Sequence, residues 1–278
     1  MSKTWVVANQ KGGVGKTTTV VSLAGEAALR GEKVLVVDLD PHGSLSAYLG
    51  AGEEEAGAGL TELFQAAAGG TTTELAASIL PTQVEGISLI PTSMALATVE
   101  RRFGQKPGMG RVVSKALAPL AAHFDLILID CPPVLGMLLI NGLAAADVAV
   151  IPTQTEPLAL VGLKRLDQTL NMMARSQAFG SCERFIVPTM FDRRTRASWD
   201  TLVQLKSGWR PNLWWEVIPS DTALREASRR GLPISHTSGG RTTRAGAAYS
   251  RLYEDVLERQ RAAGQASTAQ SPVLKEAC

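Results

Sequence analysis

The sequence is short of cysteine and aromatic residues, and it has no long hydrophobic run. Three cysteines, Cys131, Cys182 and Cys278, are too few and too scattered for a disulfide framework or a metal-binding pattern. No run of roughly 18 or more apolar residues occurs, so we expect no transmembrane helix. A strand pattern begins almost at the first residue and leaves no room for a signal peptide. These absences predict a protein of the reducing cytoplasm.

Small and branched apolar residues are abundant instead. Apolar residues make up 45% of the 278 residues, whereas charged residues make up 19% and aromatic residues 5%. Alanine, valine, leucine and glycine dominate, which suits a sheet covered by helices. The chain is long enough for one large α/β domain or two smaller ones.

The charges are distributed unevenly along a chain whose net charge is only +2. Residues 34–100 contain nine acids and no lysine or arginine, whereas residues 192–244 contain ten basic residues and five acids. A basic C-terminal third indicates an anionic partner for one surface. Basic runs also occur as ordinary solvated faces, and composition alone does not choose between the two interpretations.

The strongest motif lies between Val6 and Thr19, where a β-branched apolar run is followed by a glycine-rich loop and a helical pattern. A glycine-rich loop that ends in Gly-Lys-Thr between a strand and a helix is typical of a phosphate-binding loop. Its backbone N–H groups and the helix N-terminus would surround phosphate oxygens. Lys16 would reach the terminal phosphates, and the Thr17 hydroxyl would bind Mg²⁺. The predicted phosphate contacts are Gly12, Gly13, Val14, Gly15, Lys16, Thr17 and Thr18.

Two further apolar runs end in carboxylates. The run 33–38 ends at Asp38 and is followed by Asp40, and the run 124–130 ends at Asp130. Carboxylates at the ends of buried parallel strands lie at the edge of the sheet where ligands of open α/β folds bind. Asp130 fits a Walker B aspartate, which helps to hold Mg²⁺. Asp38 and Asp40 could instead only cap a turn.

Strand and helix patterns alternate through the chain, with no break that resembles a linker. We therefore expect a single doubly wound α/β domain, residues 1–262, with a mostly parallel sheet and helices on both faces. A disordered tail is expected at 263–278. Strands are expected near 5–7, 33–38, 86–90, 124–130, 147–152, 185–188 and 214–219. Helices are expected near 60–68, 158–175 and 241–262, and 51–85 and 101–110 are expected to be mainly surface connections.

Several motifs together resemble the ParA/MinD family of ATPases, which have a deviant Walker A loop. They are K-G-G-V-G-K-T-T with its additional Lys11, D-L-D-P-H-G-S, D-C-P-P-x-L-G and the later G-L-P-I. The resemblance covers about residues 3–260 and is nearest to short ParA/Soj-type partition ATPases or the related ATPases of chemotaxis clusters. His42 stands where the family usually has glutamine, and the sequence does not say what this changes.

The resemblance implies a P-loop ATPase that forms an ATP-sandwich homodimer and hydrolyses ATP slowly, stimulated by a partner. Lys11 would act on the nucleotide of the second subunit, and Asp40 would orient the attacking water. Thr17 and Asp130 would hold Mg²⁺. Asp38, Met190, Pro219 and Asp221 would also contact the nucleotide, partly around its base.

The resemblance also implies that the ATP-bound dimer binds DNA non-specifically and positions or segregates a plasmid, a chromosome or a protein cluster. A ParB-like or cargo-adaptor protein would activate it, and the ATP-bound form would associate with the nucleoid without stable membrane insertion. The basic C-terminal third supplies the candidate DNA contacts Arg193, Arg196, Arg225, Arg229, Arg230 and Arg241, with Arg194 and Arg244 as further possibilities.

Two other classes stay open. A MinD-like membrane-associated ATPase would use a C-terminal amphipathic helix, and an apolar stripe does occur at Tyr249, Leu252, Tyr253, Val256 and Leu257. A metabolic ATP-dependent ligase of the same fold would need a pocket for an organic substrate. Lys11 and the Asp38–Asp40 motif argue against the ligase.

Overall fold

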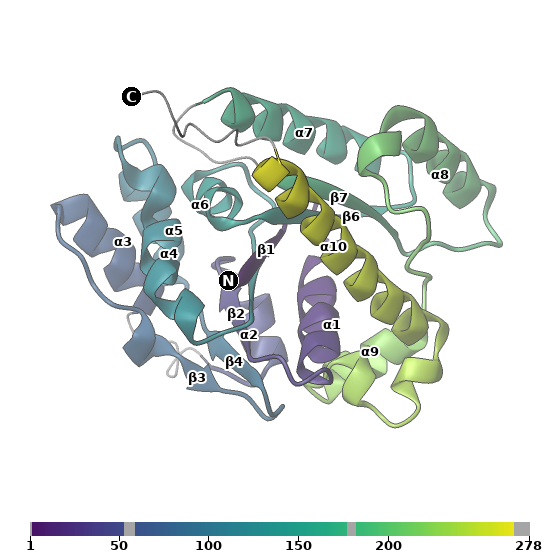
Figure 1. Cartoon of the computed structure of the whole chain (residues 1–278), viewed down its shortest axis with the longest axis horizontal. Coiled ribbons are helices and arrows are strands. Elements are labelled where there is room, and N and C mark those ends of the chain that lie inside the picture. The colour runs from purple at the N-terminus through teal and green to yellow at the C-terminus, as the bar shows by residue number, and fades with distance from the viewer. Residues whose placement is uncertain (1, 53–58, 177–181, 270–278) are drawn as a thin grey trace, which may run out of the picture.

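One seven-stranded sheet forms the centre of the protein in a computed structural model (Figure 1). The structure describes residues 2–52, 59–176 and 182–269. The strand order is β3-β4-β2-β5-β1-β6-β7, and all pairs are parallel except β3 with β4. The strands are β1 (Lys3–Val7), β2 (Val34–Asp38), β3 (Leu80–Pro81), β4 (Ile87–Ile90), β5 (Leu126–Asp130), β6 (Val148–Gln154) and β7 (Glu183–Thr189).

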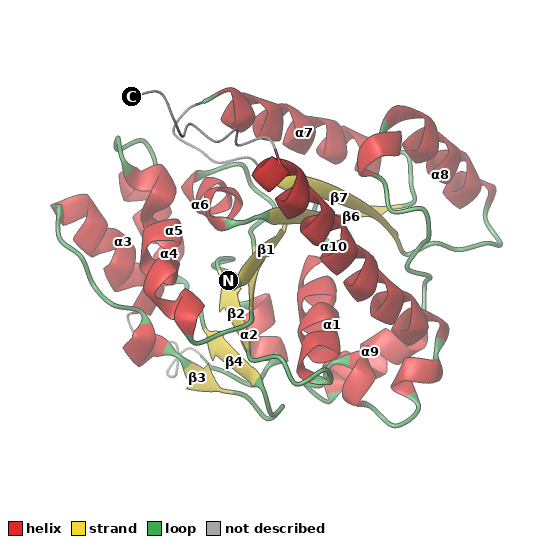
Figure 2. Cartoon of the chain, in the orientation of Figure 1, coloured by secondary structure: helices red, strands yellow, loops and turns green. Residues whose placement is uncertain are grey.

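Helices cover both faces of this sheet, as the doubly wound prediction requires (Figure 2). One face packs against α1 (Lys16–Ala28), α2 (Ser44–Tyr48), α9 (Thr222–Arg229) and α10 (Arg244–Ala269). The other face packs against α3 (Gly59–Gly69), α4 (Ala95–Phe103), α5 (Val112–Leu117), α6 (Met137–Ala145), α7 (Ala159–Arg175) and α8 (Arg196–Gly208). The strands read as continuous apolar runs because both of their faces are buried.

The central position of β1 determines where a site can form. β1 pairs with β5 on one side and β6 on the other, so the strand order reverses beside it. Val7 lies in register with Asp130, and Asp130 lies in register with Asp38 on β2. The phosphate loop and these two aspartates therefore meet at one edge of the sheet, at the switch point where open α/β folds bind ligands.

The apolar stripe of the last helix is buried in the core. Tyr249, Leu252, Tyr253 and Val256 are each at most 1% exposed, and α10 packs against α1. The Tyr249 hydroxyl lies 3.2 Å from the Thr19 hydroxyl of α1. The stripe is thus a packing surface and is not available to a membrane in this fold. In the part of the chain that the structure describes, no helix combines the length and the apolar character that spanning a bilayer needs.

Some expected elements differ in the structure. Residues 214–219 form no strand: isolated bridges join Leu213 to Ile186 and Pro219 to Phe191, with a bend between them. Trp215 lies in that bend and is exposed. The prediction of a buried strand is therefore wrong, because the apolar residues of this run do not all face the core. The segment expected as a loop at 101–110 begins inside α4, and its last residues form part of a 3₁₀ helix.

Two other boundaries also change. The connection expected at 51–85 includes the short edge strand β3, and its Glu53–Glu55 run lies outside the described residues. The last helix extends to Ala269, beyond the residue 262 expected for its end. Residues 270–278 of the expected tail lie outside the described residues.

Candidate functional site

The phosphate loop connects β1 to α1 and has the backbone shape that its glycines predict. Gly13 and Gly15 have positive φ angles of 73° and 91°, which side chains with a Cβ rarely adopt. Gly15 is the N-cap of α1, and Lys16 is its first residue. Among the described residues no side chain caps the N-terminus of this helix. The N–H groups of its first turn are therefore available to bind an anion held by the loop.

Contacts from distant strands hold the loop in place. The Thr189 hydroxyl at the end of β7 donates a 2.9 Å hydrogen bond to the Val14 carbonyl. The Asn9 amide donates to the Pro152 carbonyl at 2.7 Å. Lys16 is 8% exposed, and its Nζ donates to the Lys11 carbonyl at 3.4 Å. These contacts fix the loop without using the N–H groups that would bind phosphate.

Thr17 and Asp130 form the part of the site that fits a magnesium ion. The Thr17 hydroxyl donates to Asp130 Oδ2 at 2.6 Å, and Asp130 Oδ1 is buried with no hydrogen-bond partner among the described residues. Burial, with the nearby Asp38 charge, raises the pKa of Asp130 well above the usual carboxyl range. Within the described residues no group of three or more His, Cys, Asp or Glu side chains could hold a metal. A hydroxyl and one carboxylate are instead the set that binds Mg²⁺ together with substrate phosphates.

Asp38 and Asp40 follow β2 and have different surroundings. Asp38 is fully buried, and it accepts hydrogen bonds from the Ser46 amide at 2.8 Å, the Ser46 hydroxyl at 2.7 Å and the Asp40 amide at 3.1 Å. Burial nevertheless raises its pKa. Asp40 Oδ1 lies 2.8 Å from His42 Nδ1 and also accepts the His42 amide hydrogen at 3.1 Å. Asp38 thus anchors α2 to the sheet, and His42 orients one oxygen of Asp40.

Lys11 is held by groups of its own chain. Its ammonium forms an ion pair with Glu156 and donates to Gln154 Oε1 at 3.2 Å. Gln154 ends β6 and Glu156 follows it, just before α7. Burial lowers the pKa of Lys11. The lysine that the family resemblance assigns to a partner's nucleotide is therefore paired within the chain here.

A cavity of about 530 Å³ lies next to the loop and brings together several predicted residues. Met190, Pro219 and Asp221 line it, together with Val14, Gly15 and Thr18 of the loop. Met190 has a φ of 53°, unusual for a residue with a side chain and a form of local strain that clusters at functional sites. Asp221 is the N-cap of α9, where its Oδ1 accepts a 3.0 Å hydrogen bond from the Ala223 amide. Cavities of this size hold nucleotide-sized ligands.

The six candidate DNA-binding arginines are all exposed, and they differ in their ion-pair partners. Arg225 lines the cavity beside the phosphate loop. Arg196 pairs with Asp200 at 3.5 Å and Arg229 with Glu226 at 3.3 Å. Arg241 lies 3.8 Å from the buried Glu26. Arg193 and Arg230 have no ion-pair partner among the described residues.

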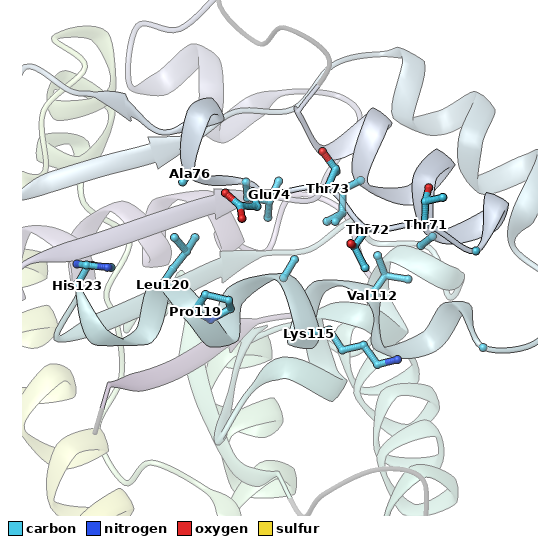
Figure 3. Close-up of a pocket in the computed structure, with 16 residues that line it drawn as sticks. Thr71, Thr72, Thr73, Glu74, Ala76, Val112, Lys115, Pro119, Leu120 and His123 are labelled. Atoms are coloured by element: carbon cyan, nitrogen blue, oxygen red, sulfur yellow. The ribbon is translucent and has the colours of Figure 1, made fainter.

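A second cavity, of about 660 Å³, lies away from this site between α3 and α5 (Figure 3). Its floor is apolar, with Leu75, Val112 and Leu120, and its rim carries the Thr71–Thr73 hydroxyls and Lys115. Figure 3 shows the threonine loop on one side of the cavity and the α5 side chains on the other. None of the residues predicted for the nucleotide lines it.

Sequence reasoning missed several residues that support the site. Asn9, Ser46, Glu156 and Thr189 make the contacts described above, although the sequence analysis gave none of them a role. For Asn9, Glu156 and Thr189, only their position at or just after the end of a strand could have suggested one, whereas Ser46 lies within α2.

The fold and the loop together define a P-loop NTPase. Residues 2–179 match the model of a family described as "AAA domain". A chromosome-partitioning ATPase Soj from Treponema pallidum is 35% identical over 93% of this chain and 98% of that protein. The chain therefore belongs to the ParA/Soj family of partitioning ATPases, as its motifs predicted.

Solved structures agree on the fold. Cobyrinic acid a,c-diamide synthase from Mycobacterium smegmatis, bound to an ATP analogue and magnesium, has a TM-score of 0.79 at 29% identity. The match covers 94% of this chain and 96% of that one. Apo McdA from Cyanothece has a TM-score of 0.81 at 24% identity, covering 92% of this chain and all of that one.

Proposed function

We propose that this chain is a Mg²⁺-ATP-dependent molecular switch of the ParA type, which dimerises on ATP, binds DNA non-specifically and hydrolyses ATP slowly to position or segregate a cargo. The observation that carries the proposal is the 2.6 Å contact between the Thr17 hydroxyl and Asp130, beside a loop whose N–H groups at 12–15 donate to no group among the described residues. This arrangement suits a triphosphate whose terminal oxygens share a magnesium ion with the protein.

Each residue then has a defined role in binding. The loop amides would donate hydrogen bonds to the β- and γ-phosphates, Lys16 would offset part of their charge, and Thr17 with Asp130 would hold the magnesium ion. Bound magnesium would offset the negative charge that develops on the phosphates during transfer. The cavity lined by Met190, Pro219 and Asp221 would receive the base. Asp38 would have a structural role in the site, because its two carboxylate oxygens accept hydrogen bonds from Ser46 and from the Asp40 amide.

Hydrolysis would depend on Asp40 and on the second subunit. A water oxygen would bond to the γ-phosphorus while the bond to the β–γ bridging oxygen breaks; ADP would leave with that electron pair, and the proton lost by the water would pass to solvent. Asp40 would orient this water, with one of its oxygens held by His42. Lys11 of a second copy would stabilise the developing charge, which makes turnover depend on dimerisation. No glutamate base is assigned, and positioning without a strong base fits slow turnover.

The output would be DNA binding by the ATP-bound dimer, with release when a ParB-like or cargo-adaptor protein stimulates hydrolysis. Exposed arginines of the C-terminal third support this role, because exposed ion pairs such as Arg196–Asp200 and Arg229–Glu226 are weak and easily exchanged for phosphates. The ATP-bound form would then associate with the nucleoid.

A ligase remains a second candidate because a solved diamide synthase is 29% identical over nearly the whole chain. Phosphate release from Mg²⁺-ATP alone separates the two, since a ligase needs its organic substrate. We expect slow release without added substrate. We also expect Lys16→Ala to abolish ATP binding, and Asp40→Ala to bind ATP but hydrolyse it at least tenfold more slowly. Normal ATP binding by Lys16→Ala would contradict the site.

A further inference from the structure

Helix α8 presents an exposed apolar stripe that no part of the described chain covers. Trp199 and Val203 lie one turn apart and are 50% and 63% exposed. Trp215, which follows α8 in the chain, is 53% exposed. The helix lies at the outer edge of the molecule, beyond β7 (Figure 1). Exposed large apolar side chains that lie close together are typical of interaction surfaces.

The two tryptophans are held in fixed orientations. The Trp199 indole N–H donates to the Arg193 carbonyl at 3.0 Å, and Phe191 contacts the ring edge-on at a centroid distance of 5.0 Å. Lys206 and Arg210 lie over the Trp215 ring, 5.6 Å and 5.5 Å from its centroid. Rigid aromatic side chains lose little conformational entropy when a partner binds, so they serve as anchors.

The charge of this surface is positive. Lys206 and Arg210 follow Trp199 and Val203 along the helix direction, and neither pairs with a carboxylate that the structure describes. The nearest acids in sequence are engaged elsewhere: Asp200 pairs with Arg196 at 3.5 Å and Glu216 with Arg251 at 2.6 Å. Two aromatic anchors and Val203, next to two cations that have no ion-pair partner among the described residues, complement an acidic partner with an apolar face.

We infer that the surface formed by Trp199, Val203, Lys206, Arg210 and Trp215 docks an acidic amphipathic helix of a partner protein. The apolar face of that helix packs on Trp199, Val203 and Trp215, and its acidic side chains pair with Lys206 and Arg210. The centre of the surface on this chain is apolar, whereas a DNA-binding surface needs a row of cations that contact phosphates. Membrane-binding basic clusters contain about four to eight lysines or arginines, and this stripe has two. The inference goes beyond the proposed function, because none of these five residues lines the nucleotide site or is among the six candidate DNA contacts.

Three labelled synthetic peptides of about 18 residues, five helical turns, test this surface. The first carries leucines on one helical face and glutamates on the other, the second has the same composition in scrambled order, and the third has lysine in place of glutamate. Fluorescence anisotropy with the full chain measures binding, with and without ATP. We expect only the first peptide to bind saturably, with one peptide per chain in either nucleotide state.

Val203→Glu and Lys206→Glu should each weaken this binding at least tenfold, which corresponds to about 1.4 kcal/mol. Both positions lie on the outer side of α8, and glutamate is a good helix former, so the fold should be retained. Met172→Glu on α7 is the matched control, because Met172 is 62% exposed and lies outside this surface. It should bind the peptide as the wild type does.

Duplex DNA and anionic phosphatidylglycerol vesicles are measured with the same variants. The inference is overturned if the first peptide does not bind, if the scrambled or lysine peptide binds equally well, or if Val203→Glu binds like the wild type. It is also overturned if Val203→Glu abolishes binding to DNA or to vesicles but not to the peptide, because the surface would then belong to a different class of partner.

Discussion

The Lys11 ammonium is paired with Glu156 of the same chain and also contacts Gln154. The side chains of Lys11 and Glu156 are 24% and 38% exposed, so the pair is accessible from outside. If Lys11 is to act on the nucleotide of a second subunit, this pair must break first. In such a dimer the pair would therefore favour the unassembled chains by the free energy of two partly exposed ion pairs, one in each chain.

Glu156→Gln should lower the dissociation constant of the ATP-dependent dimer. Partly exposed ion pairs are worth about 0.2–1 kcal/mol each and a dimer would open two of them, so we expect a decrease of up to about 30-fold. Sedimentation velocity with ATP and the hydrolysis-impaired Asp40→Ala background measures it. Glu85→Gln, at an exposed position away from the site, is the control and should leave dimerisation unchanged. Weaker dimerisation of Glu156→Gln would mean that Glu156 contributes to the dimer itself.

Asp130→Asn should stabilise the ligand-free protein and impair nucleotide binding. The Asp130 carboxylate is buried, and its Oδ1 has no hydrogen-bond partner among the described residues. The asparagine side chain carries no charge to desolvate, and its oxygen can still accept the hydrogen bond from Thr17. We expect an increase of about 1 kcal/mol in the free energy of unfolding, measured by urea denaturation. Affinity for Mg²⁺-ATP should fall at least tenfold in calorimetry. A destabilised variant would show that the buried charge is better solvated than the structure indicates.

The metal-free protein should become less stable as the pH rises above the ordinary carboxyl value of about 4. Asp38 and Asp130 have raised pKa values because they are buried, so in this range the folded state binds more protons than the unfolded chain. The free energy of unfolding then falls with increasing pH until both groups are ionised. Thermal unfolding with a chelator, between about pH 5 and about pH 8, measures this trend. The slope should be smaller in Asp130→Asn, and an equal slope would assign the effect to other groups.

Arg230 should contribute more to DNA binding than Arg229, its neighbour on the same turn. Arg229 must leave Glu226, 3.3 Å away, before it can bind a phosphate, and Arg230 has no ion-pair partner among the described residues. Gel shifts with ATP should therefore show a larger loss of affinity for Arg230→Ala than for Arg229→Ala. Each lost phosphate contact should also reduce the slope of log affinity against log salt by about one. Equal effects of the two variants would mean that the Glu226 pair opens without cost.

The phosphate loop could be predicted from sequence in detail because its shape is local. Gly13 and Gly15 adopt the positive φ values that such a loop requires, and α1 begins at Lys16 where the helical pattern begins. The run ending in Asp130 was also informative, because a fully buried strand has an unbroken apolar sequence. The run Trp214–Pro219 is also largely apolar, and the sequence analysis therefore predicted a strand there, which is wrong. Such a short run, with an exposed tryptophan at Trp215, has no periodicity that identifies a strand.

The sequence by itself determined the family, the doubly wound architecture and the phosphate loop, because glycine backbone freedom, helix starts and buried apolar runs are properties of neighbouring residues. Only the tertiary structure decided which distant groups face that loop. Thr17 and Asp130 are 113 residues apart, and Lys11 and Glu156 are 145 apart, yet parallel pairing around β1 brings each pair into contact. Strand order and register determine such contacts, and no local pattern in the chain encodes them.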